Sequence, residues 1–202
     1  MIIGLTGTYC AGKNFVAAIL EKHGLPVLDV DKLGHKVIET EKTIILERFG
    51  REILRSDGTI DRRLLGAKVF KKAAELEALE AIIHPAVNKE TSAWISFINK
   101  AQEKAQQPNV CVINAALLHR SSVFPILDAL IVVEAPVLTR LLRARRRDRL
   151  SWAALIKRFQ SQKEFSSQYF GKKTDIYRVK NSGFVKKLEG RIDEVLKLLN
   201  LN

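Results

Sequence analysis

The sequence predicts an α/β fold with three layers, a five-stranded parallel sheet between two layers of helices. Short apolar runs alternate along the chain with longer amphipathic segments, and such alternation indicates parallel strands joined by crossover helices. The runs are nearly continuous in valine, isoleucine and leucine, which is typical of strands buried on both faces. A loop with two glycines joins the first run directly to the first helical segment.

Each element follows from one of two patterns. Short apolar runs predict five strands, at Ile2–Thr6, Pro26–Val30, Val110–Ala115, Leu130–Glu134 and Ile176–Lys180. Apolar residues at helical spacing predict four helices, at Lys13–Lys22, Leu64–Ile83, Asn88–Gln107 and Phe184–Leu199. Roughly eighty residues separate the second strand from the third, far more than one crossover requires. We therefore expect a helical insertion at residues 55–107 that binds a second substrate, and a core formed by residues 1–54 and 108–202.

The composition narrows the classes of function. Two cysteines, Cys10 and Cys111, cannot build a disulfide framework, and the four histidines show no zinc-site spacing. No apolar run approaches the roughly 20 residues of a membrane span, and Met1–Leu5 lacks the basic region of a signal peptide. We therefore expect a cytoplasmic protein with no membrane partner. The chain has 34 lysines and arginines, 22 acidic residues and a net charge of +12, which favours an anionic partner.

The strongest motif is G-x-x-x-x-G-K at the first strand-to-helix junction. Glycines let backbone N–H groups converge on phosphate oxygens, the helix N-terminus attracts anions, and the lysine reaches the β- and γ-phosphates. An ordinary turn with a surface lysine is the alternative interpretation. The motif predicts that ATP is bound by Gly7, Thr8, Tyr9, Cys10, Ala11, Gly12, Lys13, Asn14 and Phe15.

Two residues of this loop are unusual. The position after the lysine is generally serine or threonine, whose hydroxyl ligates Mg²⁺, whereas this chain has Asn14. An amide oxygen can also ligate Mg²⁺, so Asn14 is a candidate metal ligand. Cys10 lies among amides that favour anions, which predicts an activated thiol. The alternative is that Cys10 only fills a turn.

An acidic pair ends the second predicted strand, in the order Leu28-Asp29-Val30-Asp31. The carboxyl ends of parallel strands border the crevice where ligands bind. Asp31 could there accept the proton of an acceptor hydroxyl, or hold Mg²⁺ through water. The alternative is that Asp31 caps the following helix.

Taken in order, the motifs resemble those of the dephospho-CoA kinase family. This family phosphorylates the ribose 3′-hydroxyl of dephospho-CoA with ATP, the last step of coenzyme A biosynthesis. The matching segments include Gly4–Gly7, Asp29–Asp31 for Asp-x-Asp, Phe49-Gly50, Asp57–Leu64 for D-G-x-x-x-R-x-x-L, Leu79–Pro85 for a helix ending in His-Pro, Arg158 with Gln162, Thr174–Ile176 and Asn181–Gly183. Their order and spacing cover nearly the whole chain.

The resemblance implies a P-loop NTPase fold, with ATP and dephospho-CoA as substrates and Mg²⁺ as the metal. Asp31 would orient or deprotonate the ribose hydroxyl, and Lys13 would hold the ATP phosphates. Asn181 would lie at the adenine side of ATP. Arg62 or Arg63 would lie with His84 near the dephospho-CoA.

The chain also departs from the family pattern. The family loop ends in Gly-Lys-Ser, whereas this chain has Asn14 in place of the serine. The family's Asp-x-Pro-Leu-Leu-x-Glu is replaced here by Asn114–Arg120. The two other hypotheses are therefore a P-loop kinase for another nucleoside or metabolite, and a non-catalytic protein of this fold that binds ATP or RNA.

Six arginines cluster within Pro136–Leu150, beside an apolar stripe of leucines. In a P-loop kinase such a helix leads into a lid, whose guanidinium groups close over ATP. We predict a lid at about residues 137–165. The family resemblance implies Arg143 as its catalytic arginine, with Arg146 or Arg147 as the next candidates. A solvated basic face is the alternative for the other arginines. The cluster lacks the interleaved aromatic residues of an RNA-binding surface, so we do not expect a nucleic-acid partner.

Overall fold

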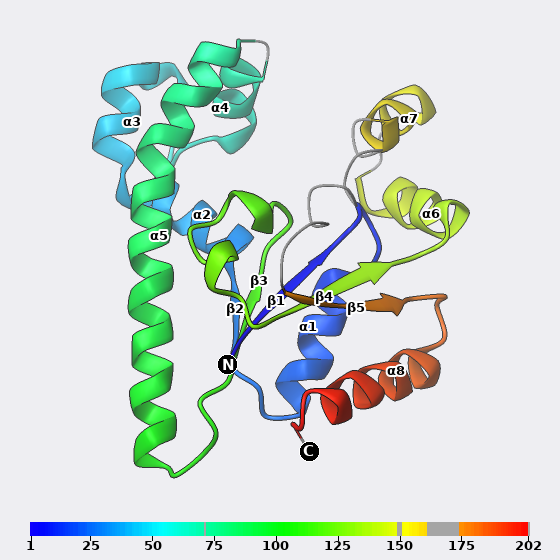
Figure 1. Ribbon diagram of the computed structural model, residues 1–202. Coiled ribbons are helices and arrows are strands. Elements are labelled where there is room, and N and C mark those ends of the chain that lie inside the picture. Colours follow the sequence, from blue (N-terminus) through cyan, green and yellow to red (C-terminus); the bar gives the residue numbers. More distant parts are fainter. Residues whose placement is uncertain (71, 149–150, 161–173, 202) are drawn as a thin grey trace. The chain divides into compact units, whose positions relative to one another are not determined.

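The computed structural model describes residues 1–70, 72–148, 151–160 and 174–201 (Figure 1). The chain divides into two compact units: a nucleotide unit, Met1–Leu28 with Ile98–Asn202, and a helical unit, Asp29–Phe97. The predicted Arg158 and Gln162 pair lies outside the described side chains, as does the end of the predicted lid at residues 161–165.

A five-stranded sheet forms the centre of the nucleotide unit. Its strands are β1 (Ile2–Gly7), β2 (Val27–Asp29), β3 (Cys111–Asn114), β4 (Ala129–Glu134) and β5 (Asp175–Lys180), in the order β2-β3-β1-β4-β5. Strand β1 pairs in parallel with β3 and β4, and β4 pairs in parallel with β5. The predicted α/β fold and its five-stranded parallel sheet are therefore confirmed.

Two helices cover one face of this sheet. Helix α1 (Lys13–Lys22) and helix α8 (Val185–Leu198) lie side by side (Figure 1). The apolar side chains of α1 recur at helical spacing, and Val16, Ile19 and Leu20 are buried against β1 and β4. Burial of each such side chain stabilises the fold by about 1.5–3 kcal/mol, so both helices are held by their apolar faces.

Two glycines of β1 allow close packing around the central strand. A Cβ at Gly7 would lie 2.7 Å from the backbone oxygen of Val133 on β4. A Cβ at Gly4 would lie 2.7 Å from side-chain carbons of Leu118 and Leu127. Leu118 belongs to the short 3₁₀ turn η2 (Leu118–Arg120), and a second turn, η3 (Phe124–Ile126), follows it. The segment after β3 therefore packs directly on β1.

The helical unit has its own core. It contains α2 (Val30–Thr40), α3 (Lys42–Phe49), the 3₁₀ turn η1 (Arg51–Ile53), α4 (Arg62–Val69) and the first part of α5 (Ala73–Lys104). Its buried apolar residues are Ile45, Phe49, Ile53, Ile60, Leu65, Val69 and Leu79. The unit begins at Asp29, before the residue 55 predicted for the insertion, because side chains of α3 share this core with those of α4. Its role as a substrate domain stays a prediction.

The helices predicted at Leu64–Ile83 and Asn88–Gln107 were wrong in their boundaries. Helix α4 already ends at Val69, and α5 runs for 32 residues from Ala73 through Pro85. Periodicity could not reveal the break, because apolar spacing is similar on both sides of it. Proline usually ends or bends a helix since it lacks an N–H and clashes with the preceding turn. Buried side chains before and after Pro85, at Leu79 and Val87, hold this helix together across it.

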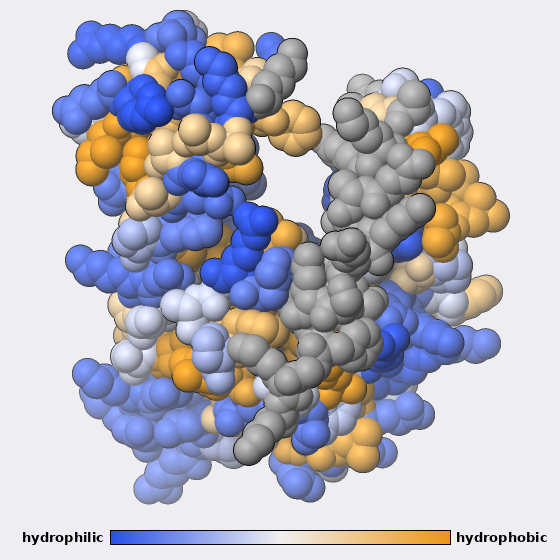
Figure 2. Space-filling model, turned by 45° about the horizontal axis from the view of Figure 1, so that its top comes forward, coloured by the Kyte–Doolittle hydropathy of each residue, from blue (hydrophilic) through white to orange (hydrophobic). Residues whose placement is uncertain are grey.

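Two further helices follow β4, at α6 (Val137–Asp148) and α7 (Trp152–Gln160). They occupy the region predicted as a lid, and that role stays a prediction. Across the described ranges we find no helix whose length and apolar character would suit a membrane span. Among the described residues, hydrophilic side chains and apolar patches share the face drawn in Figure 2.

Replacing Pro85 with alanine should stabilise the protein. Alanine restores the missing N–H and has the highest helix propensity, so we expect the free energy of unfolding to rise by about 1–3 kcal/mol. Urea denaturation followed by circular dichroism measures the change. Ser96→Ala, on the exposed face of the same helix, is the control and should change stability by no more than about 0.5 kcal/mol. A destabilised Pro85→Ala variant would contradict the prediction.

Candidate functional site

The predicted phosphate loop connects β1 to α1 and is shaped as an anion site. Cys10 and Gly12 both adopt left-handed backbone angles, with φ of 59° and 97°, and Ala11 N–H donates to the Thr8 carbonyl at 2.9 Å. Successive turns of this kind direct N–H groups into one concavity. No side chain caps the N-terminus of α1, so its partial positive charge can act on a bound anion.

One carbonyl fixes the shape of the loop. The Ala11 carbonyl accepts hydrogen bonds from Asn181 Nδ2 at 2.9 Å and from Arg143 Nη1 at 3.1 Å. Arg143 Nη2 also donates to Asn181 Oδ1 at 3.1 Å, so the three residues form a closed triangle. Two features require glycine at position 12. Its φ is positive, and a Cβ at this position would clash with Asn181 Nδ2. The structure thus joins three predicted site residues, Gly12, Asn181 and Arg143.

A pocket of about 270 Å³ lies beside this triangle. It is large enough for a purine ring, and the partly exposed side chains of Phe15 and Val185 give it apolar walls. The lining residues are Gly12, Phe15, Arg143, Asn181, Gly183, Val185 and Leu188. Phe15 and Asn181 were both predicted to contact ATP, and they share this pocket.

Tyr9 connects the loop to α6 and α7. Its hydroxyl donates to Asp148, the Arg147 guanidinium lies 5.1 Å from its ring centre, and Phe159 packs edge-on at 5.5 Å. Arg140 in turn lies 4.9 Å from the Phe159 ring centre. Asp148 and Phe159 were not predicted from the sequence, although an aromatic residue in the loop and arginines followed by an aromatic residue were visible signals for this contact.

The predicted activation of Cys10 was wrong. Burial raises the pKa of its thiol, and this effect outweighs the lowering by the guanidinium groups of Arg147, Arg140 and Arg143, of which Arg147 has the largest effect. The thiol is therefore mostly protonated near neutral pH, and only a thiolate is a good nucleophile. Cys10 fills the left-handed turn of the loop, as the alternative interpretation held. Burial also raises the pKa of Cys111, in β3.

Asn14, the candidate Mg²⁺ ligand, is held by a residue of the sheet. Asn114, the last residue of β3, donates from Nδ2 to Asn14 Oδ1 at 3.3 Å. Asn114 is 1% exposed, and its Oδ1 is buried without a hydrogen-bond partner. Elsewhere in the described residues, no three His, Cys, Asp or Glu side chains gather to hold a metal. A carbonyl oxygen at the start of α1, next to the phosphate loop, suits Mg²⁺, so Asn14 fits the predicted role.

In the helical unit, Asp29 rather than Asp31 caps α2. Asp29 Oδ1 accepts from the backbone N–H of Lys32 at 3.0 Å, which satisfies one unpaired donor of the helix. The alternative interpretation of Asp31 as the cap was therefore wrong. Asp31 lies in the first turn of α2 with an exposed side chain, so capping does not occupy it.

Asp31 and Arg62 both act on His35, which the sequence analysis missed. His35 lies one helical turn after Asp31, on the same face of α2. Partial burial lowers the pKa of His35, and Arg62 lowers it further, while Asp31 and Asp29 raise it. The imidazole is therefore mostly neutral near pH 7. Two predicted substrate residues, Asp31 and Arg62, thus act in opposite directions on the pKa of one histidine.

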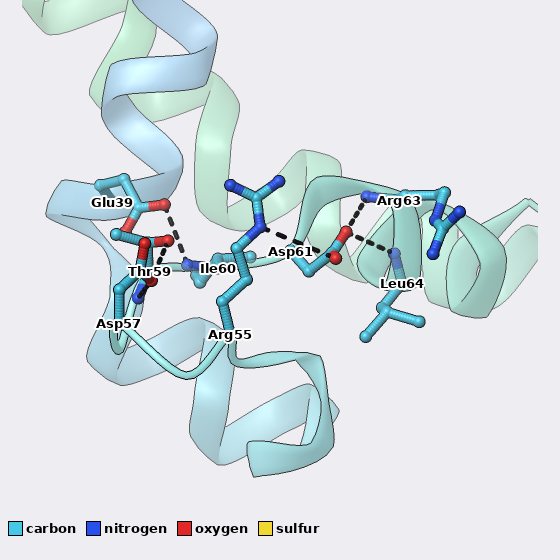
Figure 3. Close-up of polar contacts among 8 residues, drawn as sticks. All are labelled: Glu39, Arg55, Asp57, Thr59, Ile60, Asp61, Arg63 and Leu64. Carbon is cyan, nitrogen blue, oxygen red and sulfur yellow. Dashed lines mark hydrogen bonds and ion pairs between the residues drawn. The ribbon is translucent and has the colours of Figure 1, made fainter.

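The segment that carries Arg62 and Arg63 is a braced turn (Figure 3). Asp57 Oδ1 accepts from the backbone N–H and the hydroxyl of Thr59, at 2.9 and 2.6 Å. Asp61 caps α4 by accepting from the N–H groups of Arg63 and Leu64, at 2.8 and 3.2 Å. These bonds lower the pKa of Asp61. The acidic residues thus build the turn, and the side chains of Arg62 and Arg63 are exposed; their contact with a substrate stays a prediction.

His84, the remaining predicted substrate residue, lies on α5 immediately before Pro85. Its side chain is exposed. It belongs to the same unit as Asp31, Arg62 and Arg63, and its contact with a substrate stays a prediction.

A larger pocket, of about 550 Å³, lies where the chain enters β2 and β3. It is lined by His23, Gly24, Leu25, Gln102, Gln107, Pro108, Val110, Asp193, Leu196, Lys197 and Leu201. Ligands of parallel sheets bind at the carboxyl ends of the strands, whereas these segments precede the strands. None of the predicted site residues lines it.

Comparison with known proteins decides the family. The family model for dephospho-CoA kinase matches residues 1–183. The chain belongs to the dephospho-CoA kinase family. The resemblance predicted from the motifs is thereby confirmed, and the protein is a kinase, a phosphotransferase.

Individual relatives agree with this assignment. Dephospho-CoA kinase of Treponema denticola is 33% identical over 187 residues, which cover 90% of this chain and 82% of that protein. A crystal structure of a Thermus thermophilus protein is 30% identical with a TM-score of 0.80, covering 98% and 97% of the two chains. Dephospho-CoA kinase of Campylobacter jejuni shares the fold, with a TM-score of 0.64 at 22% identity and coverage of 98% and 96%.

Replacing Gly12 with alanine should reduce nucleotide affinity by disturbing the loop. The new Cβ would strain a positive φ and displace Asn181, so we expect the affinity for ADP to fall by at least about tenfold. Isothermal titration calorimetry measures this. Gly190→Ala in α8 is the matched control, because no atom outside its own helix lies within 4 Å of its Cβ. It should bind ADP normally, and equal effects of the two substitutions would contradict the prediction.

Proposed function

We propose that the protein transfers the γ-phosphoryl group of ATP to the ribose 3′-hydroxyl of dephospho-CoA. The product is coenzyme A, so the reaction is the last step of its biosynthesis. The braced phosphate loop carries the proposal: Asn181 and Arg143 hold its Ala11 carbonyl, within a family match that spans residues 1–183. ATP and dephospho-CoA are the proposed partners, and the cytoplasm is the proposed location.

ATP binds, in this proposal, between the loop and the adjoining pocket. The loop N–H groups and the N-terminus of α1 bind the phosphates. Lys13, in the first turn of α1, stabilises the charge that develops on the transferring group. The adenine occupies the 270 Å³ pocket, where Phe15 and Val185 supply apolar contact. Asn181 acts mainly through the loop, because both ends of its side-chain amide are already bonded to it or to Arg143.

Arg143 has two tasks in the proposed mechanism. Two of its nitrogens hold Ala11 and Asn181, so it fixes the loop before the substrate arrives. Its guanidinium also keeps a positive charge beside the phosphates, where it lowers the energy of the transition state. A preorganised charge of this kind needs no rearrangement during transfer.

In this proposal, residues of the helical unit bind the acceptor, dephospho-CoA. Asp31 takes the proton from the ribose hydroxyl as the phosphoryl group arrives. Arg62, Arg63 and His84 bind dephospho-CoA, and the arginines suit its phosphates. Mg²⁺ would neutralise charge on the ATP phosphates, and Asn14 is the residue that would hold it.

Turnover with a panel of acceptors tests the function. We expect dephospho-CoA alone to stimulate Mg²⁺-dependent release of ADP from ATP, with coenzyme A formed in equal amount. Adenosine, AMP and shikimate are the control acceptors. Stimulation by one of these instead would indicate a kinase for another metabolite. ATP binding without turnover on any acceptor would indicate a non-catalytic protein.

Replacing Asp31 with asparagine should lower turnover far more than ATP affinity. The asparagine keeps the size of the side chain but cannot take the proton, so we expect kcat to fall by about 10²–10⁴-fold. Helix α2 should stay intact because Asp29 caps it. Steady-state kinetics and ATP titration separate the two effects. Glu47→Gln, which removes an exposed carboxylate of α3, is the control. Lost ATP affinity with near-normal kcat would contradict the assignment.

A further inference from the structure

A pair of asparagines meets where the phosphate loop adjoins the end of β3. Asn14 is the second residue of α1, and Asn114 is the last residue of β3. They are 100 positions apart in the chain, and Asn114 Nδ2 donates to Asn14 Oδ1 at 3.3 Å. The pairing of Leu5 with Asn114 in the sheet brings the strand end beside the loop. The contact is therefore fixed by the fold.

Neither member of this pair carries a charge. In P-loop enzymes generally, a hydroxyl after the loop lysine ligates Mg²⁺, and an acidic residue from a strand holds the same ion. In such a pair, the hydroxyl of the loop residue donates a hydrogen bond to the carboxylate of the strand residue. Here the strand residue donates to the loop residue, and the pair has one negative charge fewer. The chemistry of the metal site therefore differs in charge and in the direction of the hydrogen bond.

The burial of Asn114 couples the two residues. Its Oδ1 is buried without a partner, which costs about 1–3 kcal/mol. A carboxylate at this position would be buried beside the Asn14 oxygen, another acceptor, and would cost considerably more. An amide at position 114 therefore suits an acceptor at position 14, and a carboxylate suits a donor there. A change at one position calls for a change at the other.

We propose that Asn14 and Asn114 act as one uncharged unit that receives the metal of the Mg²⁺–ATP complex. Asn14 Oδ1 is the ligand, and Asn114 is the positioning residue that fixes the Asn14 amide through Nδ2. Because the pair has no charge, the metal enters with the nucleotide and adds less to nucleotide affinity than it would beside a carboxylate. The inference rests on the proposed function only in that ATP is the nucleotide.

A double-mutant cycle tests the coupling. The probe is the β,γ-imido analogue of ATP, titrated calorimetrically in Mg²⁺ and in EDTA, and the ratio of the two dissociation constants measures the contribution of the metal. We expect Asn14→Ser/Asn114→Asp to raise this ratio by about tenfold or more. Each single variant should raise it much less, and Asn114→Asp alone should melt at a lower temperature than the double variant, because its buried carboxylate faces the Asn14 oxygen, a second acceptor.

Two control variants distinguish an effect of the asparagine pair from an effect of added charge and from an effect of misfolding. Asn109→Asp adds the same charge just before the other end of β3, and its ratio should equal that of the unaltered protein. Asn114→Ala removes the donor together with the unpaired oxygen, so it should fold and should bring the ratio towards one. Additive single effects, or an unchanged ratio in the double variant or in Asn114→Ala, would overturn the proposal.

The titration contains no dephospho-CoA, so the two proposals fail separately. A non-additive cycle in a protein that forms no coenzyme A would contradict the proposed function and support the metal pair. Turnover of dephospho-CoA with an additive cycle would overturn the metal pair alone.

Discussion

The nucleotide unit depends on the two hydrogen bonds that the Ala11 carbonyl accepts. A loop that binds anions must turn its N–H groups inward, and its carbonyls must then find donors elsewhere. Asn181 and Arg143 supply these donors at 2.9 and 3.1 Å. They come from the end of β5 and from α6, so the loop is held by elements on the far side of β1. The shape of the loop therefore depends on β5 and α6 as well as on β1.

In the helical unit, most of the described acidic side chains near the predicted substrate residues accept hydrogen bonds from the backbone. Its acidic residues serve the backbone: Asp29 and Asp61 cap helices, and Asp57 holds a turn. Each of these carboxylates satisfies N–H groups that would otherwise lack partners. The neighbouring Asp31 and Arg62 are left exposed, and both act on His35. Charges that serve the backbone and exposed charges thus alternate along short stretches of sequence.

Much of this could be predicted from the sequence. The five strands, helix α1 and the loop were visible because continuous apolar runs and G-x-x-x-x-G-K are local patterns. The course of α5 through Pro85 was not, because tertiary burial overrides the local signal of proline. The Asn14–Asn114 and Tyr9–Asp148 contacts were missed for a similar reason. They join positions 100 and 139 residues apart, and nothing in either local sequence identifies the partner. The raised pKa of Cys10 depends on burial, which composition does not reveal.

The hydrogen bond from Asn181 to Ala11 also determines when, during synthesis of the chain, the loop gains its support. Asn181 bonds to Ala11 across 170 residues of chain, and proteins are synthesised from the N-terminus. The nascent chain therefore presents its phosphate loop long before the residue that holds it has been made. The support of the loop is completed only in the nearly finished polypeptide, and a chain that ends before position 181 has the whole first motif in its sequence but lacks the hydrogen bond from Asn181 to Ala11.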